Sequence, residues 1–242
     1  MIEIRGLTKK YGDFTAVNDL TLTAEQGQIT GFLGPNGAGK TTTIRIISGL
    51  SLPTTGSVRV NGIDVIADAS RAKAVMGYVP DRPYLYEKLT GRELLQFVVN
   101  LYGKEWRDCE QRALDLLRYF ELADWVDARI ENLSHGMKQK VVIVSALAHD
   151  PSVLVIDEPM VGLDALAQRQ VRRLFRRLAE EGKTVLLTTH TLSVAEAVCD
   201  RIAIINRGKI VASGPTSELK AAAGAEGSAL EDVFLALTYV EE

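Results

Sequence analysis

The sequence has few cysteines, no long apolar run and little excess of charge. Its two cysteines, Cys109 and Cys199, stand far apart, which excludes a disulfide framework or a thiolate metal site as the main feature. The longest apolar run, Val141–Ala148 with Ser145 inside it, is far shorter than the roughly 18 residues that a membrane-spanning helix needs. The first residues lack the apolar segment of a secretory signal. We therefore expect a soluble, cytoplasmic α/β protein.

Charge and composition are those of an ordinary globular protein. Hydrophobic residues make up 46% and charged residues 24% of the 242 residues, the usual balance of a soluble domain. The net charge of −3 argues against a protein whose main task is to bind nucleic acid, so no nucleic-acid partner is expected. One run of arginines looks basic, but apolar residues at helical spacing lie between them and place them on the solvated side of a helix. These arginines are Arg172, Arg173, Arg176 and Arg177.

Short apolar runs alternate with turn residues and helical patterns along most of the chain. We predict strands at Ile2–Ile4, Ala16–Thr23, Ile29–Leu33, Ser57–Val60, Val153–Ile156, Thr184–Thr189, Ile202–Ile205 and Ile210–Ala212. We predict helices at Thr41–Leu50, Leu166–Glu181, Val194–Val198 and Leu230–Leu237. From Pro83 to Asp150 the pattern is helical, with one helix after the Thr90–Glu93 capping box and another after Ser134. Buried strands separated by helices indicate a mostly parallel sheet with helices on both faces, to which the N-terminal strands add an antiparallel part.

A glycine-rich loop lies between a predicted strand and a predicted helix. Its sequence, GPNGAGKTT, fits the pattern G-x-x-x-x-G-K-[ST] of a P-loop NTPase core. Glycines let backbone N–H groups and the helix N-terminus point at a phosphate. We expect the lysine to bridge the β- and γ-phosphates of ATP and the first threonine hydroxyl to ligate Mg²⁺. The predicted ATP-binding residues are Gly34, Pro35, Asn36, Gly37, Ala38, Gly39, Lys40, Thr41 and Thr42.

Two carboxylates end a predicted buried strand further along the chain. Asp157 and Glu158 follow the apolar run Val153–Ile156 and precede Pro159. Asp157 is expected to hold Mg²⁺ together with Thr41, as in other P-loop enzymes. Glu158 is then placed to take the proton from an attacking water. A metal carboxylate and a base beside a phosphate loop predict a Mg²⁺-dependent ATPase.

Further motifs resemble those of the ATP-binding cassette (ABC) family, over about residues 1–215. Leu133-Ser-His-Gly-Met137 is similar to the family signature Leu-Ser-Gly-Gly-Gln. The resemblance implies that Ser134 and Gly136 bind the ATP held by a partner subunit, and that His190 donates to the γ-phosphate and holds the nucleophilic water. Three more positions match family motifs by their order in the chain: Tyr11 the aromatic residue that stacks on adenine, Asp81 the Q-loop glutamine, and Asp164 the D-loop aspartate.

The signature and the Q-loop depart from the family pattern. His135 replaces the first glycine of the signature and Met137 replaces its glutamine. At the Q-loop position Asp81 stands where the family has a neutral amide. A carboxylate about 5 Å from a phosphate charge costs about 3 kcal/mol at an effective dielectric constant of 20. Asp81 is therefore expected either to lean towards the magnesium or to point away and serve a membrane partner.

The resemblance implies an architecture and a role. We expect an ATP-binding α/β core at residues 1–82 and 151–220, a helical signature subdomain at 83–150, and a linker with a short final helix at 221–242. The implied function is the ATPase subunit of an ABC transporter, dimerising with itself or a related cassette subunit around two ATP molecules. It would act on separate multi-spanning permease subunits, peripheral on the cytoplasmic face of the membrane. The ending Leu230-Glu-Asp-Val-Phe-Leu235 looks like that of drug and polysaccharide exporters, which favours export.

Two other functions share the phosphate loop with this one. A soluble ABC ATPase outside transport, such as a cluster-assembly ATPase, is the alternative that stays open. A P-loop kinase or GTPase is disfavoured by the signature and by the paired Asp157 and Glu158, and the guanine-reading Asn-Lys-x-Asp is absent.

Overall fold

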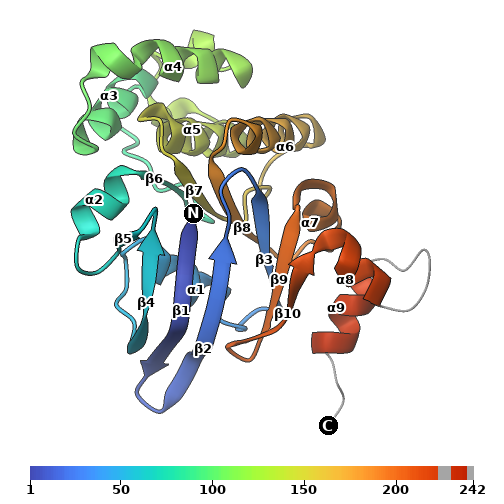
Figure 1. Ribbon diagram of the computed structural model, residues 1–242. Helices are drawn as coiled ribbons and strands as arrows, with labels where there is room; N and C mark the ends of the chain where they lie inside the picture. The colour runs from blue at the N-terminus through green and yellow to red at the C-terminus, as the bar shows by residue number, and fades with distance from the viewer. Residues whose placement is uncertain (223–229, 239–242) are drawn as a thin grey trace.

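Two β-sheets and the helices around them make up the computed structural model, which describes residues 1–222 and 230–238 (Figure 1). The antiparallel sheet has the order β2-β1-β4-β5. The larger sheet has the order β10-β9-β3-β8-β7-β6 and is parallel except between β9 and β10. The strands are β1 (Ile2–Tyr11), β2 (Phe14–Ala24), β3 (Ile29–Leu33), β4 (Thr55–Val60), β5 (Ile63–Asp64), β6 (Met76–Val79), β7 (Val153–Asp157), β8 (Thr184–Thr189), β9 (Arg201–Asn206) and β10 (Lys209–Pro215).

Single helices follow β3, β5, β7 and β8, whereas α3, α4 and α5 follow one another between β6 and β7. The α-helices are α1 (Lys40–Ile47), α2 (Ala69–Ala74), α3 (Gly91–Leu101), α4 (Trp106–Tyr119), α5 (His135–Ala148), α6 (Ala165–Glu180), α7 (Leu192–Val198), α8 (Thr216–Ala222) and α9 (Leu230–Thr238). Short 3-10 turns lie at Ala123–Trp125 and Ile130–Asn132. Figure 1 shows α3 and α4 at the top of the view, far from the free end of the antiparallel sheet. The predicted α/β fold with an N-terminal antiparallel part and a helical block is confirmed.

The central strands β3, β7 and β8 of the larger sheet are buried at every position, as expected for parallel strands covered on both faces. In β7, Leu154 and Ile156 belong to a core with the helical block, α6 and α7. Val153 and Val155 belong to a second core with α1 and the antiparallel sheet. This alternation follows from the period of two in a strand. The sheet therefore separates two hydrophobic layers, and its carboxyl edge lies between them.

Local signals explain the bounds of several elements. The capping box is present, since Thr90 accepts from the N–H of Glu93 at 3.2 Å and the Glu93 carboxylate accepts from the N–H of Thr90 at 2.8 Å. Helix α1 ends at Ile47, before the predicted Leu50, because Gly49 adopts φ = 65° and stops it in the left-handed conformation. Sequence patterns did not reveal α2 or β6, which are too short to show a periodicity.

The C-terminal part differs from the prediction at one point. Helix α8 continues to Ala222, into the stretch expected to be a linker from residue 221. The rest of that predicted linker, residues 223–227, lies outside the described residues. The final helix is present as α9.

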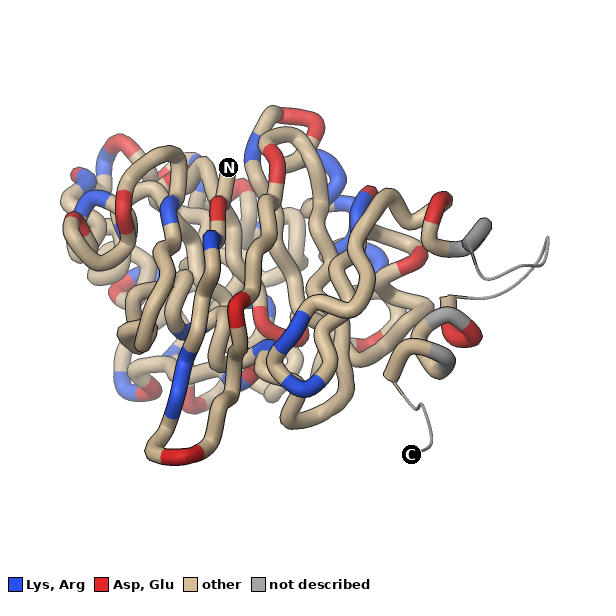
Figure 2. Tube along the Cα trace, turned by 60° about the horizontal axis from the view of Figure 1, so that its bottom comes forward, with Lys and Arg blue, Asp and Glu red and all other residues tan. Residues whose placement is uncertain are grey.

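Charged residues are distributed over the surface, and the helices are those of an ordinary globular domain. Lys and Arg segments lie among Asp and Glu segments over most of the trace (Figure 2). Within residues 1–222 and 230–238, none of the helices has the length and apolar character needed to cross a membrane.

Candidate active site

The glycine-rich loop joins β3 to α1 and is held tightly against neighbouring backbone. A Cβ at Gly39, where φ is 110°, would lie 2.5 Å from the carbonyl oxygen of Ala16. A Cβ at Gly34 would lie 2.3 Å from the carbonyl oxygen of Ile205. Only glycine fits at these two positions. The loop leads directly into α1, so the free N–H groups of the helix N-terminus face the space that the loop encloses.

Lys40 is buried inside this loop, with 7% of its surface exposed. Its Nζ donates to the carbonyl oxygens of Gly34 at 2.5 Å and Pro35 at 3.1 Å. Burial lowers the pKa of the Lys40 ammonium, and the nearby carboxylates of Glu158 and Asp157 oppose that shift. The loop carbonyls thus hold the Lys40 amine close to the carboxylates of Asp157 and Glu158, where an anionic phosphate would meet it.

Asp157 ends β7 and is 3% exposed. Burial raises the pKa of its carboxyl group, while hydrogen bonds from the side chains of Thr188 and Thr41 oppose that shift. The hydroxyl of Thr188, on the neighbouring strand β8, donates to Asp157 Oδ1. The Thr41 hydroxyl and the Asp157 carboxylate are therefore adjacent oxygen donors from two different elements.

These two donors fit a magnesium ion. Mg²⁺ prefers hard oxygen ligands and is usually held by one or two carboxylates together with substrate phosphates. In the described part of the chain, no group of three or more His, Cys, Asp or Glu side chains forms a self-sufficient metal cage. Thr41 and Asp157 would therefore suit a metal that is bound jointly with a nucleotide, which stays a prediction.

Glu158 and His190 meet directly beyond the ends of β7 and β8. Oε1 of Glu158 lies 2.7 Å from Nδ1 of His190. The backbone of Glu158 is in the left-handed region with φ = 52°, uncommon outside glycine. Its N–H donates to the carbonyl oxygen of Thr188 at 3.3 Å and to the hydroxyl oxygen of Thr188 at 3.2 Å. Strained backbone held by neighbouring hydrogen bonds is typical of functional positions.

A cavity of about 410 Å³ gathers most of the predicted residues. Its lining includes Phe14, Ala16, Pro35, Asn36, Gly37, Gly39, Lys40, Thr41, Thr42, Asp81, Asp157, Glu158 and His190. Tyr11 is paired with Phe14 across the β1–β2 hairpin but is not among the lining residues. Its ring lies 4.8 Å from the ammonium of Lys9 instead. Sequence reasoning missed Phe14, whose 65% exposure beside the hairpin turn is visible only in the fold.

Asp81 lies close enough to Asp157 to affect its carboxylate. It lines the phosphate cavity and also an adjoining cavity of about 720 Å³. Besides burial, repulsion from Asp81 raises the pKa of Asp157. Asp81 thus borders both cavities, and the two orientations expected for it remain predictions.

The signature residues lie outside the phosphate cavity. Ser134 caps α5, accepting from the N–H of Met137 at 3.3 Å, and its side chain is exposed. Asp164 similarly caps α6, accepting from the N–H of Ala167 at 2.8 Å. Neither Ser134 nor Gly136 lines the cavity that holds Lys40. Within one chain, the fold does not bring the signature and the phosphate loop together.

His135, the unusual residue of the signature, packs on the loop that precedes α6. A Cβ placed on Gly162 would lie 2.5 Å from Nδ1 and Cε1 of the His135 ring. The imidazole therefore covers a position that only glycine leaves open. This contact gives the departure from the family pattern a role in packing within the chain.

Comparisons with known proteins agree with this geometry. A family profile described as "ABC transporter" matches residues 17–161. The chain is 39% identical over 213 residues to the Nod factor export ATP-binding protein I of Rhizobium meliloti, covering 88% of this chain and 64% of that protein. It is 37% identical over 221 residues to the probable multidrug ABC transporter ATP-binding protein YbhF of Escherichia coli (strain K12). That alignment covers 91% of this chain and 38% of YbhF, so the chain spans well under half of that protein.

A solved structure shows the same fold with hydrolysis products bound. It is described as the dimeric structure of a post-hydrolysis state of the ATP-binding cassette MJ0796 bound to ADP and Pi. Its TM-score to this chain is 0.80 at 28% sequence identity, covering 89% of this chain and 98% of that one. The family profile, the relatives and this structure lead to the same conclusion as the loop and the paired carboxylates. The chain belongs to the ABC transporter family, as an ATP-hydrolysing cassette.

Proposed function

We propose that the chain powers export as the ATPase subunit of an ABC transporter, in a dimer that encloses two ATP molecules. The observation that carries this proposal is the separation of Ser134 and Gly136 from the cavity around Lys40. A two-fold axis would bring the signature of each chain to the phosphate loop of the other and create two equal sites. The relatives named for multidrug transport and Nod factor export support the direction of transport.

In the proposed site, each residue has one task. The loop from Gly34 to Thr42 and the N-terminus of α1 bind the phosphates, and Lys40 neutralises their charge. Thr41 and Asp157 would hold Mg²⁺, which would supply positive charge that stabilises the phosphate oxygens. Ser134 and Gly136 of the partner add the exposed N-terminus of α5. Tyr11, or Phe14 beside it, supplies an aromatic face for adenine, and Asp164 positions the start of α6.

The proton transfer is assigned to Glu158 and His190. Glu158 takes the proton of the attacking water as general base. An ionised carboxylate only accepts hydrogen bonds, so the 2.7 Å contact requires a hydrogen on Nδ1 of His190. In the neutral ring the other nitrogen, Nε2, then accepts a hydrogen bond from the water, whereas in the protonated ring it donates to the γ-phosphate. Because the contact fixes the ring, His190 orients the water while Glu158 accepts its proton.

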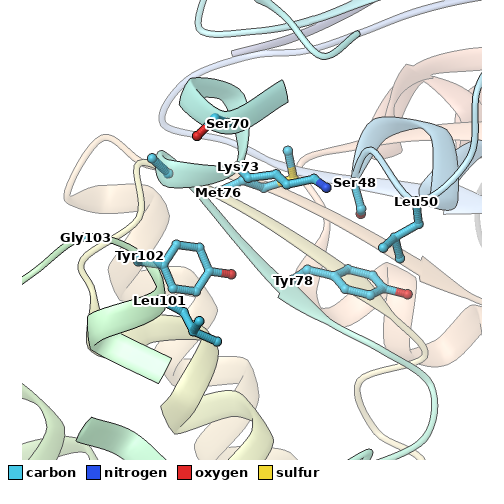
Figure 3. Close-up of a pocket in the computed structure, with 10 residues that line it drawn as sticks. Ser48, Leu50, Ser70, Lys73, Met76, Tyr78, Leu101, Tyr102 and Gly103 are labelled. Atoms are coloured by element: carbon cyan, nitrogen blue, oxygen red, sulfur yellow. The ribbon is translucent and has the colours of Figure 1, made fainter. Parts of the chain in front are cut away.

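A second cleft, about 500 Å³ in volume, is proposed as part of the permease docking surface. Figure 3 shows Leu50 and Tyr78 on one side of this cleft and Leu101 and Tyr102 on the other. Leu50 and Leu101 are 54% and 69% exposed, unusual values for large apolar side chains beside a cavity. Residues 80–87, which we include in the proposed docking surface, follow shortly after Tyr78 and carry two more exposed aromatic residues, Tyr84 and Tyr86. The occupant we propose is a short apolar helix in a cytoplasmic loop of the permease.

The domain boundaries fit this division of tasks. Residues 1–82 and 151–220 carry the phosphate cavity and form the proposed ATP-binding core. Residues 83–150 carry the signature and one wall of the docking cleft. Residues 221–242, expected to form a linker and a short final helix, include α9. The protein would lie on the cytoplasmic face of the membrane, held there by its permease subunits.

Co-purification from membranes tests the transport role against a soluble ATPase role. The wild-type chain should be recovered from detergent extracts together with a multi-spanning protein. Leu50→Asp with Leu101→Asp should abolish that association and leave basal ATPase activity unchanged, because neither residue lines the phosphate cavity. Leu166→Asp, at an equally exposed leucine of α6, is the matched control and should keep the association. Recovery of the wild-type chain free of any membrane protein would favour the soluble alternative.

A further inference from the structure

Helix α6 presents five arginines on one face. Each of them lies three or four residues from another, so they form two adjacent rows along the helix. These residues are Arg169, Arg172, Arg173, Arg176 and Arg177. The opposite face is apolar and buried, with Leu174, Phe175 and Leu178 in the core. The fold therefore gathers the arginines on the solvent side, and Arg169, ahead of the run noted in the sequence, extends it.

Two of the five arginines have structural partners. Arg176 donates to Asp200 Oδ1 and to the carbonyl oxygen of Val198, both at 2.7 Å. Arg177 lies 3.7 Å from Glu181 Oε1, and its guanidinium is 5.6 Å from the ring centroid of Tyr119. These contacts fix the far end of the arginine face to its surroundings.

The other three arginines have no such partners. Neither a hydrogen bond nor an ion pair joins Arg169, Arg172 or Arg173 to any residue within 1–222 and 230–238. Three unpaired guanidinium groups on neighbouring positions repel one another. An anion placed between them would remove that repulsion and accept their hydrogen bonds.

The arginine face is hollowed. A groove of about 420 Å³ runs between α6 and α7, with Ala197 and Val198 forming its α7 side. All five arginines line it, and Glu180 is the one acidic residue among the lining residues described. Its volume falls in the range of about 300–1,000 Å³ typical of small-molecule sites. The groove shares no lining residue with the phosphate cavity.

From this geometry we propose that the groove binds a small anion carrying two or more phosphate groups. Guanidinium groups match the geometry of phosphate oxygens and contact them in bidentate pairs. Two rows of arginines suit several phosphates better than a single charge. A nucleic acid fits less well, because the groove is short and the whole chain carries a net charge of −3. The same phosphates could come from a free metabolite or from a phosphorylated lipid headgroup.

Calorimetric titration of the full-length chain with metal-free inorganic tripolyphosphate tests the proposal. We expect two binding events, one at the phosphate loop and one at the groove. Arg172→Gln with Arg173→Gln should lower the affinity of the groove for tripolyphosphate at least tenfold. The affinity of the phosphate loop should stay unchanged. Glutamine has nearly the same helix propensity as arginine, so α6 should be preserved. Lys40→Ala should remove the loop event and leave the groove event.

A matched control separates a specific site from net charge. Arg107→Gln with Arg118→Gln removes the same charge from exposed positions of α4 and should leave both events unchanged. Equal weakening by both pairs of substitutions, or a single binding event in the wild-type chain that Lys40→Ala abolishes, would overturn the proposal.

Vesicles and DNA identify the source of the phosphates. Binding to vesicles with 5% phosphatidylinositol bisphosphate, lost on substituting Arg172 and Arg173 and absent with phosphatidylcholine alone, assigns the phosphates to a lipid headgroup. Binding of tripolyphosphate without vesicle binding assigns them to a free anion. Binding of a 20-nucleotide DNA duplex more tightly than tripolyphosphate would instead make the groove a nucleic-acid contact and overturn the proposal.

Discussion

The carboxylate of Glu158 contacts the imidazole of His190 across the ends of two adjacent parallel strands, with 2.7 Å between Oε1 and Nδ1. The pair joins a residue of strained backbone to a residue that follows β8, at the edge where parallel sheets gather their ligands. Both side chains line the cavity of the phosphate loop. The pairing is the geometric basis for assigning one residue as base and the other as its orienting partner.

Glu158→Gln should therefore keep ATP binding and lose turnover. The amide is nearly the same shape but does not accept a proton from water, so we expect a loss of about 10²-fold or more. Nucleotide affinity, measured by calorimetry, should change little because the phosphate loop stays intact. If Glu158→Gln hydrolysed ATP near the wild-type rate, Glu158 would not be the general base.

Thr188→Val should raise the pH at which Mg²⁺-dependent nucleotide binding is lost. Burial raises the pKa of Asp157, and the Thr188 hydroxyl is the strongest influence opposing that rise. Without the hydroxyl, the carboxylate holds a proton at higher pH, and a proton competes with the metal. Affinity for ATP should be measured with Mg²⁺ between pH 5 and 8. Thr184→Val removes a buried hydroxyl without a hydrogen-bond partner on the same strand and should leave the profile unchanged.

Asp81→Gln should have the opposite effect on the same carboxylate. Removing a negative charge near Asp157 lowers the pKa of Asp157, so Mg²⁺-dependent binding should persist to lower pH. The required Mg²⁺ concentration should also change, because one carboxylate near Asp157 is lost. If neither the ATPase rate nor the Mg²⁺ dependence changes, Asp81 has no part in the metal site.

Complementation between two inactive variants should reveal shared active sites. Lys40→Ala removes the phosphate-binding ammonium from the loop. Gly136→Asp places a carboxylate where the γ-phosphate of the ATP held by the partner is proposed to bind. Each variant alone should form dimers without a working site. Their heterodimer contains one site with an intact loop and an intact signature, so mixing should restore part of the ATPase activity. Absence of any recovery between folded variants that exchange subunits would rule out the shared-site arrangement.

Acid should destabilise the protein through His149. This residue is buried, its ring stacks on Tyr102 with centroids 3.6 Å apart, and burial lowers its pKa to about 4. In the unfolded chain the pKa returns to 6.5, so between pH 6.5 and 4 the unfolded state binds a proton that the folded state does not. The contribution of His149 to the free energy of unfolding is therefore fully present above pH 6.5. It is lost as the pH decreases towards 4, by about 3 kcal/mol in all.

His149→Phe keeps an aromatic ring at this position and removes the proton. Its free energy of unfolding, measured by urea denaturation, should decrease less than that of the wild type between pH 7 and 4.5, with a difference of about 2 kcal/mol. His135→Gln removes an exposed histidine and should follow the wild-type curve. If the free energy of unfolding depended on pH equally in the wild type and in His149→Phe, His149 would not cause the loss of stability in acid.

Most of the fold and the composition of the site could be predicted from the sequence. Strands β3 and β8 have the predicted bounds, because continuous apolar runs between turn residues are clear signals. The phosphate-loop residues and the two carboxylates lie together because parallel strands end at one edge. Phe14 and Thr188 could not be found in this way. Phe14 reaches the cavity only through the β1–β2 hairpin, and Thr188 contacts Asp157 only because β7 and β8 pair in register.

The contact between His135 and Gly162 was beyond prediction for a similar reason. A substitution in a signature motif shows what is missing relative to a family, but not what the new side chain touches. Its partner lies in a loop 27 residues later, brought close only by the packing of α5 and the start of α6.

Strand β7 gives the metal carboxylate two independent supports. Its alternate side chains belong to separate hydrophobic layers, with Leu154 and Ile156 on the helical side and Val153 and Val155 on the side of α1. Asp157 continues the same strand, so a cavity opened in one layer leaves the strand anchored in the other. Conservative substitutions in either hydrophobic layer should therefore leave the carboxylate at the edge of the sheet in position.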